Sequence, residues 1–69
     1  MNVIAEVAGK VWKIEVRPGA TLAAEDVILI LECMKMEIPV VAPEAGKLLE
    51  LCFKEGDVVN EGDIVAVTG

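Results

Sequence analysis

Lys35 is the residue of this 69-residue chain whose surroundings point most directly to chemistry, because it stands between Met34 and Met36. A lysine side chain carries an amine that forms covalent bonds once it has lost its proton. Methionine is flexible and polarisable, and it adapts to the surface of a protein partner. An amine between two long apolar side chains is therefore a suitable substrate for a modifying enzyme. The alternative is an ordinary surface lysine beside two methionines that pack locally.

Other kinds of chemistry have little support in the sequence. The chain has two cysteines, Cys33 and Cys52, and no histidine. Neither thiol therefore has the usual general base beside it, and two thiolates do not complete a tetrahedral metal shell. The cysteines also lack the secretory context and the spacing typical of a disulfide. We expect two free thiols, with Cys33 as a small packing residue, no metal site and no catalytic residue.

Residues 32–37 are expected to form a hairpin that positions the lysine at its tip. The apolar run 27–31 leads into this segment and the run 38–42 leads out, so the chain must reverse within a few residues, most simply at Met34-Lys35. Favoured two-residue turns need positive φ and usually contain glycine, asparagine or aspartate. Met-Lys breaks this local rule at an exposed tip, which indicates that something other than folding selected these side chains.

The hairpin separates two halves of the chain that resemble each other. A shift of 37 residues places residues 3–31 on residues 40–68, and Ala8-Gly9-Lys10 then falls on Ala45-Gly46-Lys47. Apolar positions also remain in phase across this shift. Self-similarity of this kind predicts a domain with two-fold quasi-symmetry.

Alternating apolar and charged residues predict a half-buried strand in Val11–Arg17. If the alternation is regular, Trp12, Ile14 and Val16 face the core. Later runs such as 64–67 are short and continuously apolar, as in strands buried on both faces. No stretch has a convincing helical period, so the predicted fold is all-β, a flattened barrel or sandwich of about eight short strands.

Composition agrees with this fold and excludes several partners. Hydrophobic residues make up 55% of the chain with only one Trp and one Phe, so Val, Ile, Leu and Ala must fill the core. The longest uncharged stretch, residues 18–24, is far shorter than the roughly 20 apolar residues that span a bilayer. No secretory signal is evident, so a cytoplasmic protein without membrane insertion is expected. The net charge of −6 opposes nucleic-acid binding.

Residues 32–37, which read Glu-Cys-Met-Lys-Met-Glu, resemble the Ala-Met-Lys-Met tetrad of biotinyl domains, the carriers of biotin-dependent carboxylases, decarboxylases and transcarboxylases. The resemblance includes Ala42-Pro43 before Gly46 and the run 56–63, and it covers nearly all of residues 1–69 as a single domain. It implies the hammerhead fold of two four-stranded antiparallel sheets with two-fold quasi-symmetry. There is no room for the protruding loop of some acetyl-CoA carboxylase carriers, so the chain resembles the thumbless type.

This resemblance implies that Lys35 carries covalent biotin and that Met34 and Met36 flank it in the turn, where a ligase recognises them. A biotin protein ligase would supply activated biotin to the amine. A biotin carboxylase would load the bound cofactor, and a carboxyltransferase would pass the carboxyl group to an acceptor. The chain itself would be a non-catalytic carrier domain and a monomer.

Three residues depart from the family pattern. Cys33 replaces the usual alanine, Glu25 stands where a glycine is expected in the first half, and Ala20 replaces an aspartate. Two alternatives remain open. A lipoyl carrier domain has the same symmetry and presents its lysine on a similar hairpin, although that lysine typically follows an aspartate and not a methionine. An unmodified β interaction module would keep the repeat without using the tip.

Overall fold

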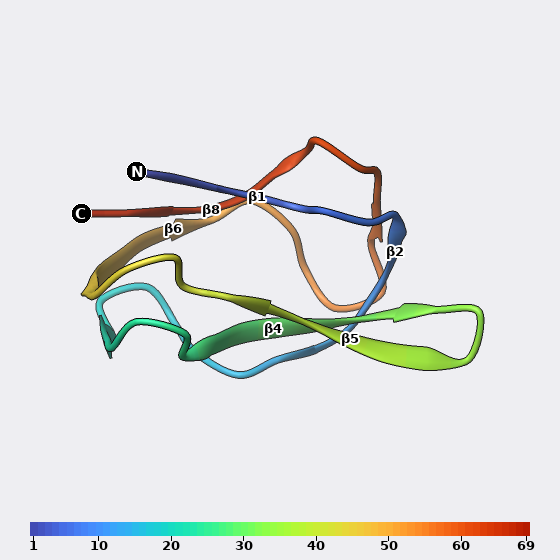
Figure 1. The fold of residues 1–69 in the computed structure, drawn as a ribbon, viewed down its shortest axis with the longest axis horizontal. Helices are drawn as coiled ribbons and strands as arrows, with labels where there is room; N and C mark the ends of the chain where they lie inside the picture. Colours follow the sequence, from blue (N-terminus) through green and yellow to red (C-terminus); the bar gives the residue numbers. More distant parts are fainter.

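Eight strands and no helix make up the computed structural model, which describes every residue of the chain (Figure 1). The strands are β1 (Asn2–Ile4), β2 (Gly9–Ile14), β3 (Thr21–Leu22), β4 (Val27–Cys33), β5 (Met36–Val41), β6 (Gly46–Leu51), β7 (Val58–Val59) and β8 (Ile64–Thr68). Two four-stranded antiparallel sheets have the orders β1-β8-β6-β3 and β5-β4-β2-β7. The predicted all-β fold is confirmed, and no helix could cross a membrane.

Strand pairings of the first half recur in the second half. β1 pairs with β8 as β5 pairs with β4, and β2 pairs with β4 as β6 pairs with β8. The pairing of β2 with β7 likewise corresponds to that of β6 with β3. Each sheet therefore contains two strands from each half of the chain, and neither half can form a complete sheet alone.

The core between the two sheets is aliphatic. Its buried apolar residues are Val3, Ala5, Val11, Leu22, Ile28, Leu29, Leu31, Val40, Ala42, Leu48, Val59, Val65 and Ala66. Strand β4 contributes three of these, as its continuous apolar sequence predicted. Neither Trp12 nor Phe53 belongs to this set, so branched aliphatic side chains provide the burial that stabilises the domain.

Trp12 faces solvent, and the prediction that it faces the core was wrong. Its side chain is 50% exposed, because the pairing of β2 with β4 shifts register between Val11 and Lys13. A β-bulge places an extra residue in one strand and interrupts the alternation of its faces. Val11 therefore occupies the core, Trp12 and Lys13 both lie outside, and Ile14 returns to pack against the core. Val16, also predicted to face inward, is partly buried there.

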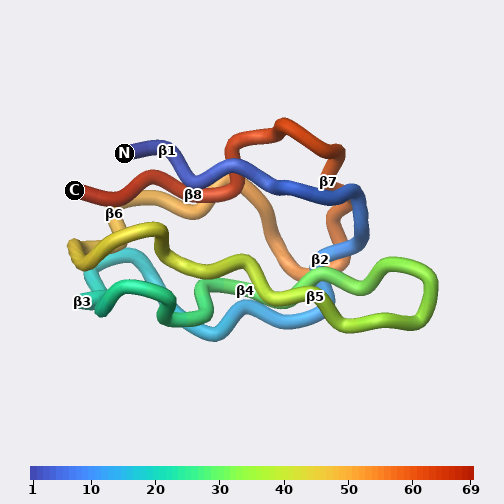
Figure 2. Tube along the Cα trace, viewed as in Figure 1, coloured from blue at the N-terminus to red at the C-terminus, as the bar shows by residue number.

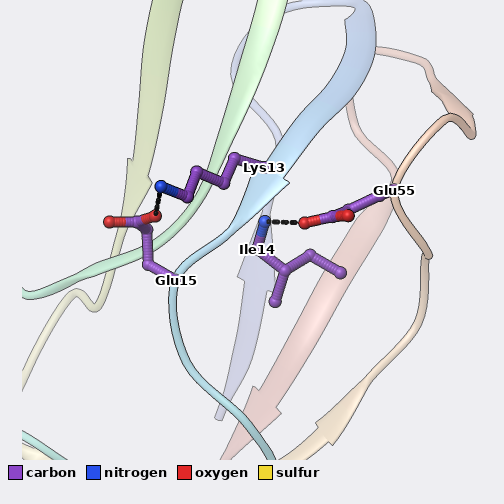
Figure 3. A network of polar contacts seen from close by, with 4 residues as sticks. All are labelled: Lys13, Ile14, Glu15 and Glu55. Atoms are coloured by element: carbon purple, nitrogen blue, oxygen red, sulfur yellow. Dashed lines mark hydrogen bonds and ion pairs between the residues drawn. The ribbon is translucent and has the colours of Figure 1, made fainter.

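A side chain extends the hydrogen bonding of β2 past its short neighbour β7. The carboxylate of Glu55 accepts a hydrogen bond from the backbone N–H of Ile14 at 3.0 Å (Figure 3). In the same view, the Nζ atom of Lys13 lies 3.7 Å from a carboxylate oxygen of Glu15. On the edge that faces β7, the end of β2 is thus held by the turn that precedes β7, whereas its other edge pairs with β4 up to Ile14.

Candidate functional site, the Met-Lys-Met hairpin

Strands β4 and β5 extend beyond the other strands and close in a two-residue turn at Met34 and Lys35. Cys33, the last residue of β4, pairs with Met36, the first residue of β5. Figures 1 and 2 show this hairpin projecting from one end of the molecule, whereas both chain ends lie together at the other end. The predicted reversal at Met34-Lys35 is confirmed.

Both residues of the turn have a left-handed backbone conformation, with φ values of 52° at Met34 and 66° at Lys35. Positive φ at both central residues defines the type I′ turn, whose twist matches that of the flanking strands. A residue with a Cβ atom reaches this conformation at a cost of roughly 1–2 kcal/mol. The backbone strain therefore lies at the residues that the sequence singled out for chemistry.

The three side chains at the tip are open to solvent. Met34 is 87% exposed and Met36 is 58% exposed, and Lys35 is exposed between them. The one ion pair of the structure joins Lys13 and Glu15, so the Lys35 amine has no carboxylate partner. The tip presents an accessible amine beside two apolar side chains that the domain leaves largely uncovered.

The hairpin has one acidic face and one apolar face, neither of which was predicted from the sequence. Glu32 lies directly opposite Glu37 in the strand register, and both side chains are exposed. Residues opposite each other share a face, and like charges in such a pair are destabilising. Cys33, Met36 and Ile38 alternate with them on the other face. Alternation counted outward from the predicted turn is the signal that could have identified both faces.

The two thiols offer little competing reactivity. Cys33 is partly buried, Cys52 is exposed, and both are free. Desolvation and the nearby Glu50 carboxylate raise the pKa of the Cys52 thiol, so less of the nucleophilic thiolate is present near neutral pH. No cluster of three or more histidine, cysteine, aspartate or glutamate side chains is arranged to hold a metal ion. Lys35 remains the strongest candidate for covalent chemistry.

Comparison with known proteins identifies the family. Residues 1–68 match the biotin/lipoyl family model described as "Biotin-requiring enzyme". The chain belongs to this biotin/lipoyl family. A "Biotin/lipoyl attachment protein" of Bacillus subtilis is 46% identical over 65 residues, which cover 94% of this chain and 89% of that protein. The urea amidolyase of Saccharomyces cerevisiae is 42% identical over 65 residues, which cover 94% of this chain and 4% of the enzyme.

A solved structure supports the same assignment for the biotin/lipoyl fold. The urea carboxylase of Kluyveromyces lactis matches the whole chain with a TM-score of 0.95 and 36% sequence identity. The match covers 6% of that enzyme, so the chain corresponds to a small part of a much larger protein there. The predicted biotinyl family and its two four-stranded antiparallel sheets are confirmed.

Proposed function

We propose that residues 1–69 form a single biotin carboxyl carrier domain, with repeats 3–31 and 40–68 around the 32–37 hairpin, and that Lys35 Nζ carries the biotin. The exposed, strained Met34-Lys35 turn is the observation that carries this proposal. A fold that needed only a tight turn would be better served by asparagine and glycine. The Bacillus relative is named as an attachment protein, and a relative from Mycobacterium leprae that is 41% identical is named as biotinylated.

The exposed tip fits a covalently attached biotin. An amide bond would form between Lys35 Nζ and the carboxyl carbon of an adenylate-activated biotin, with release of AMP and of the amine proton. This bond removes the positive charge of the lysine and leaves a long arm that is uncharged at its root. Met34 and Met36 are the side chains that we assign to recognition by the biotin protein ligase, because both are exposed and adaptable.

The carrier role follows from the position of the arm. Bound biotin supplies a ureido ring that receives a carboxyl group at a biotin carboxylase and gives it up at a carboxyltransferase. The domain holds the root of this arm at one end of a body measuring 30 × 18 × 17 Å. Tethering gives the arm an effective concentration of about millimolar near each active site. We include in this proposal a monomeric, non-catalytic domain that works in the cytoplasm.

Lys35→Arg tests the attachment site. The variant should fold normally and take up no biotin when it is co-expressed with a biotin protein ligase, because guanidinium remains protonated and is a poor nucleophile. Lys10→Arg and Lys47→Arg are matched controls at equivalent positions of the two halves, and both should be fully biotinylated. Intact mass reports the modification, and circular dichroism reports the fold. A biotin-sized increment that persists in Lys35→Arg would refute the assignment.

The same mass measurement on the unsubstituted chain separates the remaining functions. A biotin-sized increment supports the carrier proposal, and a lipoyl-sized increment would instead assign a lipoyl carrier to the same lysine. An unchanged mass in cells that contain both ligases would favour an unmodified interaction module.

A further inference from the structure

A hollow of about 150 Å³ opens beside the base of the hairpin. It lies between β5 and the segment that follows β1, and both strands are edges of their sheets. Val7, Leu31, Ile38 and Val40 contribute apolar walls, and Glu6 is the one charged residue in the lining. The walls suit an apolar ring, whereas the carboxylate can accept a hydrogen bond from a polar edge of that ring.

An apolar surface leads from the tip of the hairpin to this hollow. Cys33 and Met36 form a cross-strand pair next to the turn, and Ile38 occupies the same face of β5 farther from the tip. Ile38 also lines the hollow. An arm that starts at Lys35 and folds back along this face therefore meets the hollow without crossing the acidic face of the hairpin.

The arm is long enough for this path. Ile38 lies three residues beyond Lys35, which corresponds to about 10 Å of strand. The lysine side chain together with the chain that joins biotin to its rings extends about 14 Å, as estimated from carbon–carbon bonds of ~1.5 Å in a zigzag. The first ring of biotin can thus reach the hollow, although the arm that carries it is attached at Lys35 in the turn.

The ring system of biotin also matches the chemistry of the hollow. Its thioether ring is apolar, and a cavity of about 150 Å³ has the size that accommodates one small ring. The fused ureido ring carries N–H donors, for which the Glu6 carboxylate is a charged acceptor. Backbone groups along the edges of β1 and β5 face no partner strand and offer further hydrogen bonds.

We propose that the hollow is a resting site for the rings of biotin attached at Lys35, an inference that rests on the proposed modification. The thioether ring packs against Val7 and Ile38, and a ureido N–H donates to Glu6. Because tethering supplies an effective concentration of about millimolar, a dissociation constant in that range is enough for substantial occupancy. The carrier then holds the free ring against its own surface between visits to partner enzymes.

Methyl NMR spectra of the biotinylated chain test this site. The sample is the full chain, and intact mass must first confirm that it is biotinylated. We expect nuclear Overhauser contacts between biotin ring protons and the methyl groups of Val7 and Ile38, and shifts of these methyls relative to the unmodified chain. Leu49, which is exposed on β6 and does not line the hollow, provides the control methyl groups, which should not shift.

A matched pair of substitutions adds a second test. Val7→Phe fills the hollow and should abolish the contacts of the ring with Ile38 without preventing biotinylation. Val58→Phe adds the same side chain at a position on β7 that is 68% exposed, and it should preserve those contacts. A fully biotinylated chain with shifts confined to residues 33–37 would overturn the resting site alone. A chain that takes up no biotin would overturn the proposed function itself.

Discussion

At Met34 and Lys35, the residue types that suit the turn differ from those that suit covalent modification. The turn requires positive φ at both residues, and the sequence fills it with two side chains that reach this conformation at a cost. The cost is tolerated because β4 and β5 pair without interruption from Leu29 and Val40 up to Cys33 and Met36, and so hold the turn from both sides. Strain of this kind is expected where the identity of a side chain matters more than local stability.

Replacing the turn by Asn-Gly should stabilise the domain. In the variant Met34→Asn with Lys35→Gly, both residues suit positive φ, and we expect an increase of about 1–2 kcal/mol in the free energy of unfolding. Urea unfolding followed by circular dichroism measures this change. Lys35→Ala is the control, since it removes the amine but keeps a Cβ atom and should give no such gain. An unfolding midpoint of the double variant at or below that of the parent would contradict this account of strain.

Among the structural elements, the turns show where the two halves differ. Asp26, Asp57 and Asp63 each accept a hydrogen bond, at 2.8–2.9 Å, from the backbone N–H three residues earlier. Ala20 occupies the fourth related position and has no side-chain acceptor to offer. Glu25 differs in another way. It stands where the family pattern has glycine, and it adopts a φ of 69° although it has a Cβ atom.

Restoring the missing aspartate should strengthen the first half. In Ala20→Asp, the new carboxylate can accept a hydrogen bond from the Arg17 N–H, as Asp57 does from Lys54. One such bond contributes about 0.5–1.5 kcal/mol, which corresponds to a rise of several degrees in the midpoint of thermal unfolding for a domain of this size. Ala24→Asp adds the same charge at another exposed position nearby. Equal midpoints for the two variants would show that the new hydrogen bond contributes nothing.

The sequence predicted elements whose signal is local and missed those that depend on a partner strand. The apolar run of β4 and the reversal at Met34-Lys35 could both be predicted, because composition and chain reversal are visible within a few residues. The inward orientation of Trp12 was wrong because a bulge is a mismatch between two strands, and alternation within one strand does not reveal it. The hollow could not be predicted either, since its walls come from segments on both sides of the core.

The domain as a whole has its chain ends together at one end and the hairpin at the other. The N-terminal amine of Met1 donates a hydrogen bond to the carbonyl of Thr68, so the chain ends lie side by side. They lie opposite the hairpin, as Figure 2 shows. Each sheet combines strands from both halves of the chain, so the contacts that hold the fold together are strand pairings. We therefore expect the fold to tolerate a break in a single loop.

This arrangement predicts that circular permutants fold and that only some of them accept biotin. If Gly69 is joined to Met1 by a short turn, a permutant opened between Met34 and Lys35 keeps every strand, and we expect native circular dichroism. Its lysine lies at a free end without the type I′ turn, and a small displacement of a reacting group can cost about a hundredfold in rate, so biotinylation should be nearly lost. A permutant opened between Glu61 and Gly62 keeps the hairpin and should be biotinylated at the parental rate. Equal rates in the two folded permutants would show that the ligase needs the lysine but not the turn that presents it.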